Sequence, residues 1–484
     1  MERLILTAAF LLPLLSGTFL LLIPQEKKRL LYDLSMVFTL LTSFLAWWAV
    51  LSASSAETEL FAFSEQLVFV LRLDGLGRFF AGLVATLWPL TTLYAFSYMD
   101  REERLPGFFG FFLMSFGATL GVAMAGNMLT MYCFYELLTL STIPLVLQPQ
   151  TKEAQRAGRT YMLCSLGGAA FGFITLTYLL HQGADGLFCY GGLRLADADN
   201  VALMYIIGFL GFGVKAAVFP IAFWLPKVSV APTPVTALLH AVAVVKSGAF
   251  AVARLTWYAF GVEILRGTIA QWIPMGLAAF TIVYGSSMAL KETHFKRRLA
   301  WSTVANLSYI LLGLTMMSAE GFSASLLHLL FHAQTKILAF FCAGSVLCSS
   351  RREYLPELNG LGKTMPVTFV CFTVSALSLT GIPLFSGFVS KWYLLTAAVH
   401  EGSALSLWGA AALLISALLT AMYMFGVVVR AFFPSDGSII EGEAQEADWR
   451  MLLPMTLLAA LIVYSGCSSG RITELCVRIA QGLL

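Results

Sequence analysis

Charged side chains are scarce in this sequence of 484 residues. Asp, Glu, Lys and Arg make up 12% of the chain, whereas soluble domains carry roughly 25%. A chain with so few charges cannot cover a large water-facing surface. The charge content therefore excludes an ordinary soluble protein.

The sequence also lacks long polar stretches and closely spaced cysteines. The longest polar segments, 53–72, 182–200 and 433–449, are loops of about 20 residues or fewer, too short for a soluble domain that binds a nucleotide. The eight cysteines include no C-x-x-C pair, which argues against a disulfide framework, a metal site or a cluster. We expect no cofactor, no bound metal and no nucleic-acid partner.

Apolar runs of about 20 residues recur along the whole chain instead, and 58% of its residues are hydrophobic. Such a run crosses about 30 Å of hydrocarbon. In lipid only helices and closed barrels satisfy their own backbone, and the runs lack the alternation of barrel strands. We predict an all-α integral membrane protein of about 14 spans. These lie near 3–24, 30–52, 76–98, 107–125, 127–147, 158–182, 201–223, 232–258, 268–290, 298–316, 325–348, 366–399, 405–432 and 450–467.

Basic residues are distributed unevenly between the predicted loops. About 18 Lys and Arg, among them Arg101, fall on one side of the predicted spans, and only 6 fall on the other. Cytoplasmic loops retain Lys and Arg, so we predict a multi-pass protein of the cell membrane with both termini on the non-cytoplasmic side. We interpret the N-terminal apolar run as a retained first span. The tail 470–484 is too polar to span and is expected to lie in the interface.

Ten ionisable side chains fall inside the predicted spans. A charge at the bilayer centre costs roughly 2.5–3.5 kcal/mol on insertion scales, so each such residue needs a partner, water or a function. They are Arg78, Glu136, Lys215, His240, Lys246, Arg254, His328, His332, Lys336 and Lys391.

Glu136 and Lys215 are predicted to form an intramembrane ion pair. Glu136 lies about ten residues into an otherwise apolar helix, where a carboxyl used only for packing is the alternative. Lys215 follows Gly213 and precedes Pro220. Proline removes a backbone donor and clashes with the preceding turn, so we expect a broken helix beside the lysine. Broken helices with a charge at mid-membrane are typical of transport sites, and we prefer this interpretation to a snorkelling lysine.

His328, His332 and Lys336 recur at i, i+4 and i+8, so they are predicted to share one stripe of a helix. Three titratable groups in a row suit proton hopping through water. Two histidines on one face cannot supply opposite haem ligands, and no carboxylate or thiol nearby in sequence completes a metal site. On another span, Lys246 is a predicted relay residue, whereas His240 is as consistent with packing as with a relay.

Lys391 ends a second segment interrupted by Gly and Pro, with Gly381, Pro383 and Gly387 before it. Lys215 and Lys391 lie five spans apart, and an odd offset inverts the topology. We therefore predict inverted repeats of spans 4–8 and 9–13, with helices 7 and 12 broken. The predicted units of this single membrane domain (1–484) are spans 1–3 in 1–106, the repeats 107–258 and 268–432, and a last span with its tail in 450–484.

Four segments then resemble a known family. LPKVSVAPTPVTALLHAVAVVKSG (225–248), KETHFKRRLAWSTVANLSY (291–309), HLLFHAQTKILAFFCAGSV (328–346) and GIPLFSGFVSKWYLL (381–395) are similar to motifs of the antiporter-like subunits of respiratory complex I. The same family includes subunits of Mrp-type Na⁺/H⁺ antiporters and of energy-converting hydrogenases. The resemblance runs from about residue 70 to 435, with the segments in the family's order.

The resemblance implies a fourteen-helix fold in which proton translocation is driven by a larger complex, either redox-driven or cation-exchanging. It implies no catalytic centre in this chain, and other membrane subunits as partners. Whether Na⁺ is also carried stays open. The implied proton path uses Glu136, Lys215, Lys246, His328, His332, Lys336 and Lys391, with His240 and Arg254 as accessory residues.

Three departures from the family pattern leave the parent complex open. Lys227 replaces a usual acid, His294 stands where Asp is frequent, and Gly426 stands where Arg is common. The remaining candidates are the subunit-4 type of complex I, the D type of the Mrp antiporter and hydrogenase-associated homologues. The alternative functions are a stand-alone secondary transporter of a small solute and an electron carrier that binds quinone or haem.

Overall fold

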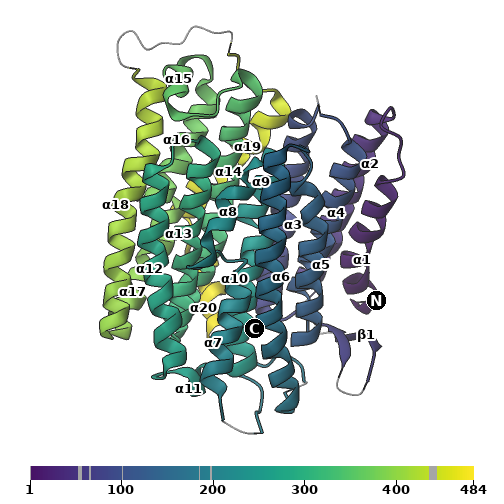
Figure 1. Ribbon diagram of the computed structural model, residues 1–484, viewed down its shortest axis with the longest axis vertical. Helices are drawn as coiled ribbons and strands as arrows, with labels where there is room; N and C mark the ends of the chain where they lie inside the picture. The colour runs from purple at the N-terminus through teal and green to yellow at the C-terminus, as the bar shows by residue number, and fades with distance from the viewer. Residues whose placement is uncertain are drawn as a thin grey trace.

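The protein is a bundle of long helices that run nearly parallel (Figure 1). The computed structural model describes residues 2–52, 57–64, 67–100, 102–184, 186–196, 199–434 and 444–484; the predicted basic residue Arg101 and parts of the predicted loops lie outside them. Both chain ends lie in the lower half of the view. The long unbroken helices are α1 (Glu2–Leu20), α2 (Lys28–Leu51), α3 (Gly75–Tyr98), α4 (Leu105–Ala123), α5 (Met128–Val146), α6 (Lys152–His181), α12 (Ile269–Lys291), α13 (Phe295–Thr315), α14 (Ala319–Ser350), α18 (Ala404–Phe432) and α19 (Trp449–Cys467).

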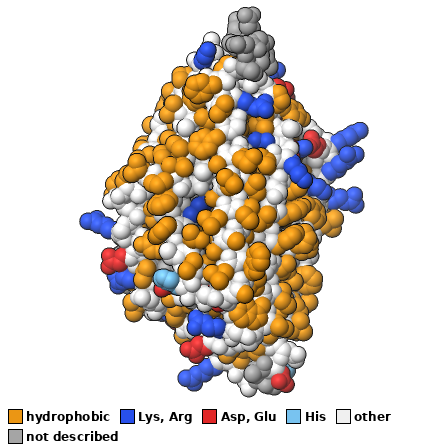
Figure 2. Space-filling model, turned by 90° about the vertical axis from the view of Figure 1, so that its left-hand side faces the viewer, with side chains coloured by type: hydrophobic (Ala, Val, Ile, Leu, Met, Phe, Trp, Pro, Cys, Tyr) orange, Lys and Arg blue, Asp and Glu red, His pale blue; other side chains and the backbone are white. Residues whose placement is uncertain are grey.

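Within the described residues, eleven helical stretches are long and apolar enough to cross a membrane: the helices above other than α13, together with the interrupted stretch Thr233–Phe260. Figure 2 shows hydrophobic side chains over most of one face, with charged side chains gathered toward its ends and edges. The predicted all-α membrane architecture is therefore confirmed. The count of fourteen spans stays a prediction, because several predicted spans are divided into shorter helices.

Shorter elements make up the interrupted segments and the ends of the bundle. Two interruptions fall in predicted spans 7 and 12, and a third, which we did not predict, falls at Val242–Ala243 in span 8. The short helices are α7 (Val201–Gly213), η1 (Ile221–Phe223), α8 (Trp224–Lys227), η2 (Val228–Val230), α9 (Thr233–Ala241), α10 (Val244–Arg254), η3 (Leu255–Phe260), α11 (Val262–Leu265), η4 (Leu355–Leu358), α15 (Leu361–Thr364), α16 (Pro366–Thr380), α17 (Ser386–Glu401) and α20 (Gly470–Ala480).

A small hairpin occupies part of the segment 53–72, which we had predicted to be a loop. Strands β1 (Thr58–Ala62) and β2 (Val68–Leu71) pair antiparallel, with Thr58 opposite Leu71 and an irregularity between Glu59 and Phe61. The start of α5 fixes the second strand. Asn127 donates to the Val68 carbonyl over 2.8 Å, and the Val70 amide donates to the Thr130 hydroxyl over 2.9 Å. These long-range contacts could not be predicted from the local sequence.

The centre of the bundle is formed by α9, α10 and α14. The apolar stretch of Thr233–Phe260 is entirely buried, and that of Ala319–Ser350 is 94% buried, whereas the equivalent figure for Lys28–Leu51 is 33%. Helix α14 packs against α9, α13, α16 and α17. Ionisable residues on α10 and α14 therefore face protein and not lipid.

A clasp between two loops lies at the end of the bundle opposite the hairpin. The Phe295 amide donates to the Glu353 carbonyl over 2.8 Å, and the Leu355 amide donates to the Thr293 carbonyl over 3.0 Å. The His294 Nε2 lies 3.4 Å from the Glu353 carboxylate. His294, which departs from the family pattern, thus has an acidic partner on the facing loop.

The clasp predicts a pH dependence of stability. The hydrogen bond from His294 holds the pKa of the Glu353 carboxyl below its ordinary value of 4.5, against the opposing effect of burial. A lowered folded-state pKa stabilises the fold above the unfolded value and loses this contribution as the pH falls through the lowered value. Replacing Glu353 with Gln should lower the thermal unfolding midpoint at pH 6–7, and this difference should shrink as the pH falls below about 4.5 and vanish below the lowered pKa. A difference that is constant across this range would contradict the assignment.

Candidate ion-translocation site

The break in α7 places Lys215 in irregular backbone inside the bundle. Helix α7 ends at Gly213, and regular structure resumes only at Ile221. Ala217 adopts a φ of +54°, a left-handed conformation that ends the helix. The Val214 carbonyl accepts a hydrogen bond from the indole of Trp224 over 2.8 Å. The predicted broken helix is therefore present, and its irregular part includes the lysine itself.

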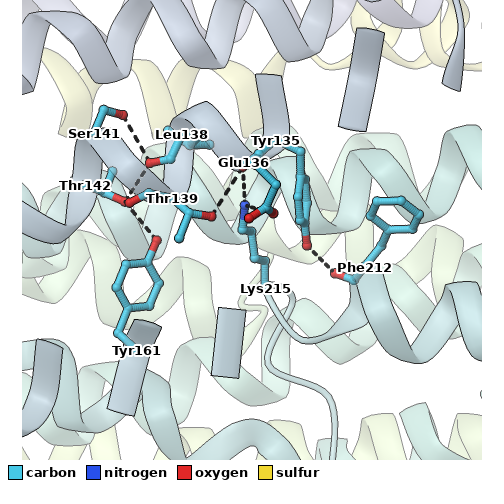
Figure 3. Close-up of polar contacts among 9 residues, drawn as sticks. All are labelled: Tyr135, Glu136, Leu138, Thr139, Ser141, Thr142, Tyr161, Phe212 and Lys215. Carbon is cyan, nitrogen blue, oxygen red and sulfur yellow. Dashed lines mark hydrogen bonds and ion pairs between the residues drawn. The ribbon is translucent and has the colours of Figure 1, made fainter. Parts of the chain in front are cut away.

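Lys215 and Glu136 lie at ion-pair distance (Figure 3). The Lys215 Nζ is 3.7 Å from the Glu136 Oε1, and it donates a hydrogen bond to the Tyr135 carbonyl. It also lies 3.3 Å from the centroid of the Tyr135 ring, whose hydroxyl donates to the Phe212 carbonyl over 3.1 Å. The ammonium is thus held by a carbonyl and an aromatic face, and the carboxylate lies just beyond hydrogen-bond distance.

Lys246 is joined to the histidine stripe. Its Nζ lies 2.5 Å from the His332 Nδ1. A Cβ atom at Gly248 would lie 2.6 Å from the Ala216 amide nitrogen, so only glycine allows α10 to pack against the broken part of α7. Helix α10, which carries Lys246, therefore packs directly against the backbone next to Lys215. No hydrogen bond joins the two lysines directly among the described residues.

The three residues of the predicted stripe on α14 have two kinds of environment. The rings of His328 and His332 stack with centroids 5.7 Å apart, and the His328 Nδ1 lies 3.0 Å from the Ser390 hydroxyl of α17. Lys336 instead donates to α13, where the Leu299 carbonyl is 3.1 Å away and the Ser302 hydroxyl 2.5 Å away. The two histidines therefore connect α10 with α17, and Lys336 forms a separate branch toward α13.

The side chain of Lys391 reaches the C-terminal end of α16, in the second interrupted span. Its Nζ donates to the Leu379 carbonyl over 2.5 Å and to the Thr380 carbonyl over 3.2 Å. These carbonyls end α16, where Gly381 adopts a φ of +93°. A cation at a helix C-terminus is favourable because the last carbonyls are unpaired and the helix dipole is negative there. Lys215 and Lys391 thus both donate to a backbone carbonyl beside an interrupted span, but Lys215 lies in the irregular backbone and Lys391 lies within α17.

A small internal cavity lies beside His328, His332 and Lys391. The space open to water in it is about 10 Å³, enough for about one molecule. Three atoms of the lining residues, the Nε2 atoms of His328 and His332 and the Oδ1 of Asn306, are buried and make no hydrogen bond to a described residue. The cavity is lined by Asn306, His328, Phe331, His332, Thr335, Ser378, Leu379, Gly387 and Lys391.

The predicted accessory residues lie apart from this row. His240 packs against Phe340 with ring centroids 4.9 Å apart, and neither ring nitrogen bonds a described residue. Arg254, only 1% exposed, forms a two-pronged ion pair with Asp74, the N-cap of α3. Arg78 donates to the Leu73 carbonyl over 3.2 Å at the start of α3. The contacts of Arg254 indicate that it joins α10 to α3.

Several polar partners were missed from the sequence. Tyr135 precedes Glu136 in the sequence, but it holds Lys215 through its backbone carbonyl. No sequence pattern predicts which backbone oxygen a lysine will contact. Ser302, Ser390 and Asp74 are ordinary residues at helix positions and ends, and only the fold brings them to Lys336, His328 and Arg254. No group of three or more His, Cys, Asp or Glu suited to a metal ion occurs in the part of the chain that the structure describes.

Comparison with known proteins identifies relatives across most of the chain. The family model described as NADH:quinone oxidoreductase/Mrp antiporter, transmembrane, matches residues 125–421. The Na⁺/H⁺ antiporter subunit A1 of Staphylococcus haemolyticus (strain JCSC1435) is 30% identical over 435 residues, which cover 84% of this chain and 53% of that protein. The protein of the same name from Staphylococcus aureus (strain MRSA252) is 29% identical with the same coverage. The chain thus spans about half the length of these curated relatives.

Two solved structures share the fold. A chain of the membrane-bound sulfane sulfur reductase, an archaeal respiratory membrane complex, superposes with a TM-score of 0.86 at 24% identity, covering 99% of this chain and 97% of that one. A chain of the Mrp complex from Dietzia sp. DQ12-45-1b gives a TM-score of 0.86 at 21% identity, covering 99% and 52%. At these identities the likeness concerns the fold alone.

The Asp74–Arg254 pair leads to a prediction about stability. Removing one partner of a buried ion pair leaves an uncompensated charge and typically costs about 3–5 kcal/mol. We expect Asp74→Ala to destabilise the protein by that amount in an unfolding titration, and the double variant Asp74→Ala/Arg254→Leu to recover much of the loss.

The partly exposed pair Arg72–Glu57, whose side chains are 30% and 47% exposed and 3.7 Å apart, supplies the control. Glu57→Ala should cost no more than about 1 kcal/mol, because solvent screens such pairs. Equal effects of Asp74→Ala and Glu57→Ala would disprove a special role for the buried pair.

Proposed function

Because the chain belongs to the NADH:quinone oxidoreductase/Mrp antiporter family of membrane subunits, we propose that it translocates protons as one subunit of a larger membrane complex. The observation that supports this most strongly is the row of buried titratable side chains. Glu136 lies on α5, and Lys215 lies in the break that follows α7. Lys246 and His332 lie on the central helices α10 and α14, and Lys391 lies on α17. The small cavity lies beside His332 and Lys391.

In the proposed mechanism the Glu136–Lys215 pair acts as the first gate. Two unit charges 4 Å apart attract by about 4 kcal/mol at an effective dielectric constant of 20. When the carboxylate moves away, the ammonium loses this stabilisation and its proton is driven toward Lys246. The Tyr135 carbonyl and ring stay in contact with the lysine in both states and keep it in place.

Beyond the gate, the proton moves along Lys246, His332 and His328 toward Lys391. The 2.5 Å contact between Lys246 and His332 allows direct transfer. His328 and His332, each with an unpaired ring nitrogen, line the small cavity together with Lys391, and one water bridges such groups where two or more polar partners are available. Lys336 is a side branch that exchanges protons through Ser302.

Glu136 also supports the proposal of a membrane partner. Its side chain is 19% exposed, although it lies well inside α5 (Met128–Val146). A carboxylate that faces lipid at this depth is costly. We propose that a second membrane subunit covers this face of α5.

The proposed orientation in the membrane rests on the basic residues of the loops, and the proposed inverted repeats rest on the two interrupted spans. The excess of Lys and Arg on one side of the predicted spans favours a cytoplasmic location for that side and an outward location for both ends of the chain. The carbonyl contacts that Lys215 and Lys391 each make beside an interrupted span support inverted repeats of residues 107–258 and 268–432.

The energy source distinguishes two forms of the proposal. The names of the curated relatives favour exchange of H⁺ against Na⁺, whereas the sulfane sulfur reductase is a respiratory complex. A stand-alone transporter of a small solute is less consistent with the site, because its direct contacts run between ionisable side chains, Lys215 with Glu136 and Lys246 with His332. A Na⁺ gradient imposed on proteoliposomes should drive proton movement in the first form only.

The gate is tested by proton flux. In the purified complex reconstituted into proteoliposomes, Glu136→Gln and Lys215→Ala should each reduce proton flux at least tenfold, since the gating charge pair is lost. Lys227→Ala is the matched control, because Lys227 is an exposed lysine at the end of α8, just beyond the same interrupted span, and this variant should keep its flux. Unchanged flux in the two gate variants would refute the mechanism.

The relay contact between Lys246 and His332 predicts non-additive effects. If the two side chains transfer the proton as one unit, Lys246→Ala/His332→Ala should impair flux no more than the worse single variant, because residues in one hydrogen-bonded unit do not act independently. His240→Ala combined with Lys246→Ala should instead give roughly the product of the single effects. If the two single losses of proton flux multiplied in the double variant, Lys246 and His332 would not belong to one proton path.

A further inference from the structure

The indole of Trp224 lies next to the gate, and the mechanism proposed above gives it no role. Trp224 begins α8 and is fully buried. Its Nε1 donates over 2.8 Å to the carbonyl of Val214, the residue that precedes Lys215. The ring also packs against Tyr161 of α6, with ring centroids 5.1 Å apart. Trp224 therefore contacts both the irregular backbone that carries Lys215 and a neighbouring helix.

A second contact connects this pair of rings to the helix that carries Glu136. The hydroxyls of Tyr161 and of Thr142 on α5 lie 2.8 Å apart (Figure 3). Thr142 follows Glu136 by six residues on this helix, which is about 9 Å along its axis. Tyr161 is fully buried and Thr142 is 1% exposed, so the bond is shielded from solvent. The contacts of Tyr161 and Trp224 thus run from α5 to the break after α7, the two elements that carry the ion pair.

The hydrogen bond from the indole also decides which carbonyls are open to the ammonium. A carbonyl oxygen has two lone pairs. The Val214 carbonyl accepts from the Ala217 amide over 3.0 Å and from the indole over 2.8 Å, so both lone pairs are used. The Lys215 ammonium donates instead to the Tyr135 carbonyl, at 3.7 Å from the Glu136 carboxylate. Without the indole donor, a buried acceptor next to Lys215 would stand open.

We propose that Trp224 is the positioning residue that sets the spacing of the Glu136–Lys215 gate. Its N–H occupies the Val214 carbonyl and fixes the backbone before the lysine. Its ring, through Tyr161, keeps this backbone at a fixed distance from α5. Trp224 does not carry the proton itself, because an indole N–H is a donor only. The inference rests on the proposed gate and names a residue that holds its two charges at the distance from which they switch.

The test compares two substitutions that keep either the large ring or the donor. Trp224→Phe removes the donor, whereas Trp224→His is smaller but carries an N–H at the corresponding ε position. In the purified complex reconstituted into proteoliposomes, Trp224→Phe should reduce proton flux at least about fivefold, as expected for one lost buried hydrogen bond. Trp224→His should keep more flux than Trp224→Phe. A role in packing alone predicts the reverse order, because Phe fills more of the site.

The matched control is Trp88→Phe. Trp88 is also buried, but its Nε1 makes no hydrogen bond to a described residue, so the same substitution removes packing alone and should leave flux unchanged. Tyr161→Phe keeps its ring and removes only the hydroxyl that meets Thr142, and it should also lower flux. Its counterpart is Tyr205→Phe, which breaks a similar buried contact, 2.9 Å from the Thr256 hydroxyl, near the start of α7, and should not.

A double variant separates positioning from general damage. Glu136→Gln/Trp224→Phe should show the same low flux as Glu136→Gln alone, because the spacing no longer matters once the gate is lost. Thermal unfolding above the assay temperature shows that each variant is folded. Equal flux in Trp224→Phe and Trp88→Phe, or more flux in Trp224→Phe than in Trp224→His, would overturn the inference. The proposed gate then still stands if Glu136→Gln and Lys215→Ala lower flux, and it fails together with the inference if they do not.

Discussion

An ammonium group that has left water needs oxygen atoms to replace the water, and this requirement shapes the centre of the molecule. Lys215, Lys336 and Lys391 each donate to a backbone carbonyl, of Tyr135, Leu299 and Leu379 respectively. In a regular helix most carbonyls are already bonded, and only the last turn offers free ones. The end of α16 supplies free carbonyls to Lys391. Tyr135 and Leu299 instead lie inside α5 and α13, so their carbonyls accept from a lysine in addition to their place in the helix. Lys246 differs, since its partner is an imidazole.

The same requirement separates permanent contacts from adjustable ones. A carbonyl stays where the backbone is, so the contacts of Lys215 with Tyr135 persist whatever the charge of Glu136. The carboxylate, 3.7 Å away and partly exposed, is the component that can move. A loose carboxylate next to a firmly held ammonium is suited to switching, whereas the tight Asp74–Arg254 pair is suited to holding helices together.

Most of the architecture could be predicted from the sequence because its signals are local. Apolar runs, intramembrane charges, and Gly and Pro beside Lys215 and Lys391 indicated the helices, the titratable residues and two of the breaks. The third break, at Val242–Ala243, has no proline, and it lies where α9 ends against α3 and α14. Partners such as Ser390, Asn306 and the Tyr135 carbonyl were not predictable, since they come from packing between distant segments. The stripe on α14 was predicted as one row, but Lys336 points to α13 because Ser302 and the Leu299 carbonyl lie there.

The central claim is that the buried titratable groups form one hydrated row through the middle of the bundle. The most direct measurement is an experimental density map of the protein in lipid, at a resolution that shows bound water. The account predicts ordered water between Lys215 and Lys246, and in the cavity between His332 and Lys391. Apolar side chains closely packed between these groups, with no water density, would contradict it.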